Sequence, residues 1–367
     1  MIRLSPIRSD VVRRNLLQLR KLVNYLGLTI CYRLGLVHVP FSPSQIDIEP
    51  TNTCNLTCEH CQVTHWNRPR THLSKDQFIQ ITAQFPRLVK VKLQGMGEPF
   101  LNKQLVDMLE SGERAGLVMH VFTNGTCMTD AVRARLRTLR HTHIQFSLDG
   151  ARRDTFESIR PGSNFKKVLT NIRTLVSGSR KKDRYSTWTL ILKSNVGELQ
   201  DITRLASTLG VQTVHFQSTL SSWGKDELEE VNRPKRVSRW STEYESARSR
   251  ATTEGRELGL NLKFHEDLPF SQGHHCVFPW KTCYVDASGN VVPCCVLADA
   301  QTMSMGNLFE ESFASIWNGP RYKEFRRKHV SGDVPEVCRG CYAASASGPS
   351  SEQQPPEPVA EVSTQHR

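Results

Sequence analysis

The sequence lacks the features of a secreted or membrane-spanning protein. Its beginning shows no basic segment, apolar run and small-residue cleavage site in that order, so a secretory signal peptide is not expected. The apolar run 22–31 is too short to cross a bilayer and is broken by Asn24 and Gly27. Without a secretory context, the eleven cysteines are expected to be metal ligands rather than a disulfide framework. We therefore expect a cytoplasmic protein, in a reducing compartment that would also suit an oxygen-sensitive cofactor.

Hydrophobic residues are also scarce, at 38% of the 367 residues. A polar Pro/Ser-rich tail over residues 346–367 dilutes an otherwise normal content. We expect this tail to be disordered, because it cannot bury enough apolar surface to offset the entropy of ordering. The remaining length is sufficient for one large domain and a smaller one.

Acidic residues are nearly absent from residues 1–40, where Asp10 is the only one. A basic arm is therefore expected over residues 1–44. Because this charge is local rather than spread over the fold, no nucleic-acid partner is expected. The basic residues of 1–40, which give a net charge of +6 out of +12 for the chain, are Arg3, Arg8, Arg13, Arg14, Arg20, Lys21 and Arg33.

Residues 10–37 of the arm are expected to form an interrupted amphipathic helix. One interpretation is a helix that lies on anionic lipid as a peripheral membrane contact. The other, which we favour from the sequence, is a helix packed on the body of the protein with its basic face in solvent. In either case, deleting residues 1–40 is expected to spare catalysis. The apolar residues at helical spacing are Val12, Leu16, Leu19, Leu22, Val23 and Leu26.

The chain is organised around one short segment that holds three cysteines, Cys54-Asn55-Leu56-Thr57-Cys58-Glu59-His60-Cys61. Three thiolates at C-x3-C-x2-C spacing can converge on one metal centre. They supply one ligand fewer than the four cysteines usual for a [4Fe–4S] cluster, so one iron would be free to bind another molecule. A tetrahedral structural zinc is the alternative, with His60 or His65 as its fourth ligand.

Residues 45–218 alternate between expected strands and expected helices. Strands are expected at 46–49, 89–93, 119–123, 144–148, 187–192 and 213–217. Helices are expected at 74–85, 103–115, 129–140, 164–177 and 197–208, and residues 219–262 are expected to be a mostly helical connector. Six βα repeats predict an α/β fold with a parallel sheet. The three-cysteine loop then follows the first strand, at the end of the sheet where β/α barrels build their active sites.

The segment Thr51-Asn52-Thr53-Cys54-Asn55-Leu56-Thr57-Cys58-Glu59-His60-Cys61 closely resembles the signature loop of the radical S-adenosylmethionine (SAM) enzymes. The resemblance implies a partial (β/α)6 TIM-like barrel and a [4Fe–4S] cluster on Cys54, Cys58 and Cys61. SAM would chelate the open iron, and its reductive cleavage would give methionine and a 5′-deoxyadenosyl radical that takes a hydrogen atom from the substrate. The cofactors would carry the radical chemistry, while the protein positions them and excludes water.

Further segments at the strand ends resemble SAM-binding segments of the family, and they follow in the family's order. Gly95-Met96-Gly97-Glu98-Pro99 is similar to the family's Gly-Gly-Glu-Pro, with Met96 inserted between the glycines. Taken alone, each segment is also explained as a turn, a helix cap or a solvent-exposed side chain. The residues that the resemblance implies to be cofactor-binding are His60, Gly95, Gly97, Glu98, Thr123, Asn124, Ser147, Asp149, Arg160 and Asn195.

A second group of cysteines lies within residues 276–341. Residues 285–292 predict a hairpin with a Ser-Gly-Asn turn that leads to Cys294 and Cys295. Cys338-Arg339-Gly340-Cys341 is a C-x2-C motif. Four thiolates, with one of Cys294 or Cys295 among them, would complete a site for an iron–sulfur cluster or for a structural zinc.

This second group resembles the SPASM or shorter twitch extension of radical SAM enzymes. The resemblance favours an iron–sulfur cluster over zinc and leaves Cys283 and Cys295 as doubtful ligands. The chain lacks the further cysteines of a two-cluster SPASM domain, so one fully ligated auxiliary [4Fe–4S] cluster is expected. The ligands chosen from the resemblance are Cys276, Cys294, Cys338 and Cys341.

The predicted organisation is the arm at 1–44, the barrel at 45–262, the auxiliary-cluster domain at 263–345 and the tail at 346–367. The resemblance implies a radical SAM oxidoreductase, and we expect net oxidation of a small metabolite, with an electron donor such as flavodoxin or ferredoxin. A peptide-modifying maturase is the alternative, although residues 1–44 are short for a peptide-binding domain. The non-enzyme alternative is a zinc- or iron-binding interaction protein. The sequence identifies neither the substrate nor a catalytic acid or base.

Overall fold

One twisted sheet organises the computed structural model of the protein, which describes residues 6–66, 68–222, 225–265 and 275–346. The sheet has ten strands in the order β10-β9-β8-β1-β2-β3-β4-β5-β6-β7. The neighbours from β8 through β1 to β7 all pair in parallel, and β9 and β10 add an antiparallel edge. The predicted disordered tail lies, from residue 347 on, outside the described residues.

The predicted α/β fold and its parallel sheet are confirmed. The six predicted strands are present, each within about two residues of its expected bounds, and a seventh parallel strand, β7, was not predicted. This strand spans the boundary that the sequence placed at residue 262. The strands are β1 Gln45–Ile48, β2 Lys90–Leu93, β3 Val118–Thr123, β4 Thr142–Ser147, β5 Tyr185–Leu190, β6 Thr213–Gln217, β7 Asn261–His265, β8 Tyr284–Val285, β9 Asn290–Val292 and β10 Gly306–Asn307.

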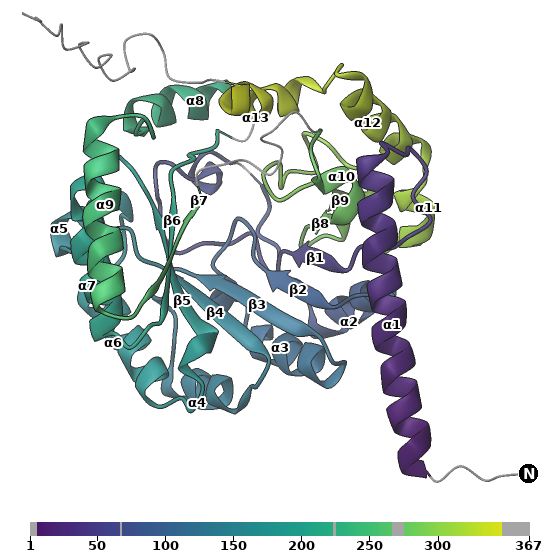
Figure 1. The fold of residues 1–367 in the computed structure, drawn as a ribbon, viewed down its shortest axis with the longest axis horizontal. Helices are drawn as coiled ribbons and strands as arrows, with labels where there is room; N and C mark the ends of the chain where they lie inside the picture. Colours follow the sequence, from purple (N-terminus) through teal and green to yellow (C-terminus); the bar gives the residue numbers. More distant parts are fainter. Residues whose placement is uncertain (1–5, 67, 223–224, 266–274, 347–367) are drawn as a thin grey trace, which may run out of the picture.

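Helices cover the outer face of the curved sheet (Figure 1). Each predicted helix is present, whereas the helix Arg153–Ile159 and the helices between residues 278 and 346 were not predicted. Those of the barrel are α2 Lys75–Ala83, α3 Leu105–Arg114, α4 Asp130–Thr138, α5 Arg153–Ile159, α6 Phe165–Ser177, α7 Leu199–Thr208, α8 Asp226–Asn232 and α9 Thr242–Glu257. The others are α1 Pro6–Arg33, α10 Phe278–Lys281, α11 Phe313–Trp317, α12 Pro320–Ser331 and α13 Glu336–Ala346.

The strand pattern explains where the core lies. In β2, Val91 and Leu93 are fully buried, whereas Lys90 and Lys92 on the opposite face are only half-buried. Alternation along a strand sends successive side chains to opposite faces, so the apolar face packs on the helices and the polar face lines the inside of the barrel. Helix α2 begins with a capping box, in which Ser74 accepts from the Gln77 amide and donates its own amide to the Gln77 side chain.

The second cysteine group is joined to the barrel sheet. The predicted hairpin is present as β8 and β9, and Gly289 takes the positive φ of 85° that its turn requires. Strand β8 pairs in parallel with β1, with Asp47 opposite Tyr284. The segment that carries the auxiliary cysteines therefore continues the same sheet as the strand that leads into the three-cysteine loop.

Helix α1 packs on this second segment by one face only. Asn24, Leu28 and Cys31 are buried, and a Cβ built at Gly27 would lie 2.3 Å from the Phe41 ring. The C-terminal half of the helix is therefore part of the body rather than a peripheral arm. None of the helices in the described part of the chain is long and apolar enough to cross a membrane.

The opposite face of α1 differs from the arrangement favoured by the sequence. We expected a packed helix with its basic face in solvent, but apolar side chains occupy the solvent face. Their exposed fractions are 56% for Leu19, 54% for Leu22, 53% for Val23, 51% for Leu26 and 56% for Ile30. The pattern of apolar residues did indicate a helix, but it did not identify which face is covered.

Candidate active site

The three-cysteine loop follows β1 at the carboxyl end of the parallel strands. Cys58 is buried, while Cys54 and Cys61 are half-buried. Burial raises the pKa of all three thiols, that of Cys61 to about 12, and the neighbouring thiols raise the pKa of Cys58 and Cys61 further. Three thiols that influence one another in this way stay protonated unless a cation offsets the burial. This donor set fits a cationic iron cluster, because metals bind the thiolate form.

Arg160 and Asp149 form a buried ion pair beside this loop. The Arg160 Nε and Nη2 atoms donate to one Asp149 oxygen, Oδ2, at 2.7 and 2.6 Å. Asp149 is fully buried, and its Oδ1 accepts from the Leu190 amide at 2.8 Å. The pKa of Arg160 is raised by Asp149 and by the nearby Cys58 and Cys61, although burial opposes this. The pair therefore holds the Arg160 guanidinium in place next to the cysteines, with the Asp149 carboxylate balancing much of its charge.

Glu98 connects the second and third strand ends. Its Oε1 accepts from Thr123 Oγ1 at 2.7 Å and from the Phe100 amide at 3.1 Å, and its Oε2 accepts from the Asn124 amide at 2.7 Å. These bonds leave Glu98 with room for at most one further good donor, since a carboxylate accepts about four. The predicted contact between Glu98 and the SAM ammonium stays a prediction.

Asn124 in turn contacts the three-cysteine loop. Its side-chain Nδ2 donates to Asn55 Oδ1 at 3.1 Å, and Asn55 Nδ2 donates to Thr126 Oγ1 at 2.9 Å. Gly97 is equally close to the loop, because a Cβ built there would lie 2.4 Å from the Thr51 carbonyl oxygen. Gly97, Thr123 and Asn124 are thus brought together around the cysteine loop, and their contact with SAM stays a prediction.

Gly95 and the inserted Met96 face a different neighbour. A Cβ built at Gly95 would lie 2.5 Å from Glu49 Cγ, so a glycine leaves room for this carboxylate. The Met96 amide donates to Glu49 Oε1 at 3.0 Å. The Met96 side chain packs with the auxiliary segment, in a cluster that contains Tyr284 and Leu297. The departure from the family's Gly-Gly-Glu-Pro therefore coincides with a contact between the two cofactor regions.

The remaining predicted cofactor residues lie at the same edge of the sheet. His60 is half-buried in the cysteine loop, and burial lowers its pKa to about 4. Ser147 ends β4 and is half-buried. Asn195 is fully buried, and its side chain bonds to the Leu192 amide and to the carbonyls of Asp149 and Leu190. Asn195 therefore fastens the ends of β4 and β5, and its contact with SAM stays a prediction.

The inner face of the barrel is polar. Burial lowers the pKa of His120 to about 3 and that of His215 to about 4. The His120 ring stacks on that of His143 on the neighbouring strand β4, with centroids 4.6 Å apart. The Trp188 ring stacks on His215 and His265 with centroids 5.1 and 4.7 Å apart. Neutral imidazoles, an indole and the Lys92 ammonium are therefore available inside the barrel.

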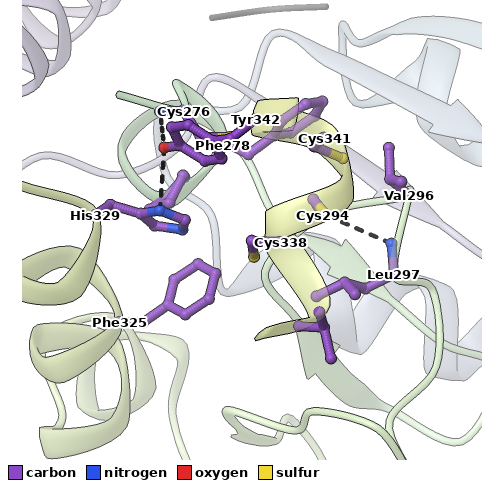
Figure 2. Close-up of a pocket in the computed structure, with 12 residues that line it drawn as sticks. Cys276, Phe278, Cys294, Val296, Leu297, Phe325, His329, Cys338, Cys341 and Tyr342 are labelled. Atoms are coloured by element: carbon purple, nitrogen blue, oxygen red, sulfur yellow. Dashed lines mark hydrogen bonds between the residues drawn. The ribbon is translucent and has the colours of Figure 1, made fainter. Parts of the chain in front are cut away.

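Cys276, Cys294, Cys338 and Cys341 line one apolar cavity (Figure 2). Cys338 and Cys341 lie one turn apart on α13, Cys276 precedes α10, and Cys294 follows β9. Burial raises the pKa of all four thiols, and the other thiols add to this for Cys276, Cys294 and Cys338. The arrangement fits a centre with four protein ligands. Among the described residues, no three His, Cys, Asp or Glu side chains are grouped closely enough to hold a single metal ion.

The two doubtful cysteines lie elsewhere. Cys283 is buried in the main core. Burial raises the pKa of Cys295 well above its usual value, and the charge of Asp47 raises it further. Cys294, not Cys295, thus shares the cavity with the other three cysteines, and its assignment as a ligand remains a prediction.

Several residues that organise the site were not identified from the sequence. Glu49 and Asn55 act through contacts with residues far along the chain, to Tyr284 and Thr126. One local sign of the role of Glu49 was its position directly before a proline at a strand end. The structure shows that this acid is buried. The third residue is His329, which lines the auxiliary cavity and was not part of any motif.

Comparison with known proteins defines first a class, that of iron–sulfur enzymes built on a β/α barrel, and then a family. The sequence model of the radical SAM superfamily matches residues 48–206, and that of SPASM, an iron–sulfur cluster-binding domain, matches residues 276–342. The chain belongs to the radical SAM superfamily and carries a C-terminal SPASM domain. Its radical SAM domain binds a [4Fe–4S] cluster and SAM, and its SPASM domain binds auxiliary iron–sulfur clusters.

Relatives cover most of the chain. An AdoMet-dependent heme synthase of Methanosarcina barkeri is 28% identical over 349 residues, which span 86% of this chain and 96% of that protein. A PqqA peptide cyclase of Rhizobium meliloti is 23% identical over 324 residues, which span 82% of this chain and 79% of that protein.

Solved structures share the fold. Streptococcus suis SuiB bound to its precursor peptide SuiA superposes with a TM-score of 0.63 at 15% identity, over 78% of this chain and 67% of that one. Native anSMEcpe with bound AdoMet and the Cp18Cys peptide superposes with a TM-score of 0.61 at 16% identity, over 83% of this chain and 87% of that one.

Proposed function

We propose that this radical SAM enzyme removes a hydrogen atom from a small polar metabolite inside the barrel and that the reaction is a net oxidation. One observation carries the proposal: four cysteines line a single cavity in the SPASM domain (Figure 2). Four protein ligands would leave no iron open to a substrate, so this centre would serve in electron transfer or structural support. Net oxidation needs such an electron acceptor.

The bound cofactors supply the chemistry: the first cluster and SAM provide the 5′-deoxyadenosyl radical, and the auxiliary cluster provides an acceptor for the substrate's electron. The protein residues have three tasks. Cys54, Cys58 and Cys61 hold the first cluster. The Arg160 guanidinium, fixed by Asp149, offers a cation to the SAM carboxylate. The polar side chains at the ends of β2 and β3 fix the loop that approaches SAM.

The inner face of the barrel supports a small polar substrate. Its residues include Lys90 and Lys92 on β2 and His120 on β3, all half-buried. Desolvation lowers the pKa of Lys90, and Lys92 lies 4.0 Å from Asp47. Cationic groups in a partly desolvated interior favour a substrate that carries an acidic group. The similarity to a heme synthase over nearly its whole length agrees with a small-molecule substrate.

A peptide-modifying maturase is the second candidate. It is supported by the similarity to a PqqA peptide cyclase and by the fold shared with SuiB, whose structure holds a precursor peptide. The identity to the cyclase is lower than to the heme synthase, 23% against 28%, and covers less of the relative. Either reaction would draw its first electron from a donor such as flavodoxin or ferredoxin. We place the enzyme in the cytoplasm.

The two candidates are separated by what stimulates SAM cleavage. The anaerobically reconstituted enzyme would be incubated with SAM, a reductant and a metabolite extract divided into a small-molecule and a peptide fraction. We expect the small-molecule fraction to increase 5′-deoxyadenosine and to yield a product that lacks two hydrogen atoms. Stimulation by the peptide fraction alone would favour the maturase, and a product of unchanged mass would exclude net oxidation.

Cys338→Ala combined with Cys341→Ala tests the acceptor role. This variant should still form 5′-deoxyadenosine but should lose the oxidised product, because the auxiliary centre is incomplete. Undiminished oxidised product would leave the auxiliary cluster with a structural role only. A spectrum that shows substrate bound to the auxiliary cluster would contradict its full ligation by protein.

A further inference from the structure

The solvent face of α1 is apolar over about three helical turns. Leu19, Leu22, Val23, Leu26 and Ile30 are each more than half exposed, while the opposite face is buried on the protein. These five residues, termed the α1 stripe, follow i, i+3, i+4, i+7 and i+11 spacing, so they share one side of the helix. Figure 1 shows the N-terminal part of α1 extending beyond the body of the protein. An exposed apolar stripe of this length marks an interaction surface.

The charges around the stripe are of one sign. From residue 11 to residue 46 the chain contains no acidic residue, whereas Arg20, Lys21 and Arg33 belong to the same helix. Beyond the end of α1, Gly35 lies against Val330 of α12, which is 47% exposed. The apolar stripe is thus flanked by basic residues of its own helix.

We propose that the α1 stripe and its basic surroundings bind the surface of an anionic lipid bilayer. A helix with an apolar face and cationic flanks lies in the membrane interface, with the apolar side chains among the acyl chains and the cations at the phosphates. A second copy of the chain is a poorer occupant, because two such basic helices would repel each other. The described helices do not include one able to span the membrane, so the contact is peripheral.

The test uses vesicles and the reconstituted full-length protein. We expect flotation with vesicles that contain phosphatidylglycerol, none with pure phosphatidylcholine, and weaker flotation as salt is raised. Leu22→Glu combined with Leu26→Glu should reduce the bound fraction at least about tenfold, since both side chains would leave the acyl region. Leu258→Glu is the matched control, because Leu258 is also exposed, at 38%, but ends α9 on the other side of the barrel.

The outcome distinguishes the possible occupants of the stripe. SAM cleavage by the wild type and by both variants should be the same in the absence of vesicles. Absence of binding to both kinds of vesicle would overturn the lipid proposal. A dimer in solution that the Leu22→Glu and Leu26→Glu changes dissociate, without vesicle binding by the wild type, would assign the stripe to a second copy instead.

A second inference rests on His329, and it depends on the ligand set proposed for the auxiliary cluster. His329 is buried, lines the same cavity as the four cysteines, and contacts the Tyr342 hydroxyl through Nδ1 at 3.2 Å (Figure 2). That hydroxyl accepts from the Cys276 amide at 2.8 Å. We assign the hydrogen of this contact to the phenol, in which case a neutral imidazole carries its own hydrogen on Nε2. Nε2 has no hydrogen-bond partner among the described residues.

We infer that His329 Nε2 donates a hydrogen bond to a sulfur of the auxiliary cluster and raises its reduction potential. Donors to the sulfurs stabilise the more negative, reduced cluster. His329 is thus a positioning and tuning residue, held in its tautomer by Tyr342.

The measurement is a redox titration of the auxiliary cluster, followed by electron paramagnetic resonance, in a protein in which Cys54, Cys58 and Cys61 are Ala. Adding His329→Phe should shift the midpoint to a more negative potential, and His329→Gln, which keeps an N–H donor, should restore part of the shift. An unchanged midpoint with unchanged iron content would overturn the inference, as would loss of the cluster in both variants. If the cluster signal instead survives Cys338→Ala with Cys341→Ala, the ligand set itself is wrong.

Discussion

The Tyr284 hydroxyl donates a hydrogen bond of 3.0 Å to the Glu49 carboxylate, and both side chains are only 1% exposed. Glu49 directly follows β1, the strand that leads into the three-cysteine loop, whereas Tyr284 begins the hairpin of the SPASM domain. The same carboxylate accepts from the amides of Met96 and Ala287. One buried acid thus joins the loop that approaches SAM to the domain that holds the auxiliary cysteines.

Tyr284→Phe is therefore expected to destabilise the protein. Removing the hydroxyl leaves a buried carboxylate one donor short, which costs about 1–3 kcal/mol in the free energy of unfolding. Tyr322→Phe is the control, because Tyr322 is also buried but its hydroxyl has no hydrogen-bond partner among the described residues. Chemical denaturation of the reconstituted protein measures both changes. Equal stability of the two variants would show that the Glu49 contact contributes nothing.

Arg160 is expected to matter for stability as well as for SAM. Arg160→Leu would leave Asp149 buried without its cation, at a cost of roughly 3–5 kcal/mol. Arg160→Lys keeps a charge but loses the paired donors, so it should retain more stability and still bind SAM less tightly. Arg153→Leu is the control, since Arg153 pairs with Glu157 on the exposed surface. Unfolding curves and SAM titrations would together refute this role if Arg160→Leu behaved like Arg153→Leu.

Cys294 and Cys295 are adjacent in sequence but differ in their surroundings. Cys294→Ala should lower the iron bound by the SPASM domain, because Cys294 shares the cavity with Cys276, Cys338 and Cys341. Cys295→Ala should keep the iron, because Cys295 is not among the residues that line this cavity. Iron and sulfide analysis of the two proteins after anaerobic reconstitution decides between them. Loss of iron from Cys295→Ala alone would reverse the assignment.

The structure changes the expectation for a truncated arm. Deleting residues 1–18 should leave stability and SAM cleavage unchanged. Deleting residues 1–40 should destabilise the SPASM domain, because it removes the bond from Tyr32 to the His275 carbonyl and the Leu36 carbonyl that accepts from Trp280. It also removes the Val37 carbonyl that accepts from the buried Arg326. Thermal unfolding compares the two proteins, and equal midpoints would mean that the helix is peripheral after all.

Local patterns in the sequence identified most of the barrel. The strands from Gln45–Ile48 to Thr213–Gln217 were found because apolar residues that pack on the helices alternate with polar ones or form short apolar runs. Strand β7 was missed because Asn261–His265 follows a charged helix and has only half-buried or exposed residues. The two groups of cysteines were found from their spacing, and the resemblance to radical SAM enzymes selected the ligands among them. Glu49, Asn55 and His329 were not, because their partners lie far along the chain.

The same reason explains the error about α1. Helical spacing placed Leu19, Leu22 and Val23 on one face, but no local rule says which face the rest of the protein covers. Burial of Asn24 and Leu28 depends on contacts with segments of distant sequence, such as the bond from Asn24 to the Ser42 carbonyl.

The most direct test of the account measures 5′-deoxyadenosine. Wild-type protein, reconstituted with iron and sulfide under anaerobic conditions, would be supplied with SAM and a strong reductant, beside a variant with Cys54→Ala, Cys58→Ala and Cys61→Ala. We predict that the wild type forms 5′-deoxyadenosine and methionine, and that the variant forms neither while it keeps the iron of the auxiliary cluster. An equal yield of 5′-deoxyadenosine from the variant would contradict the assignment of these three cysteines as the site of radical generation.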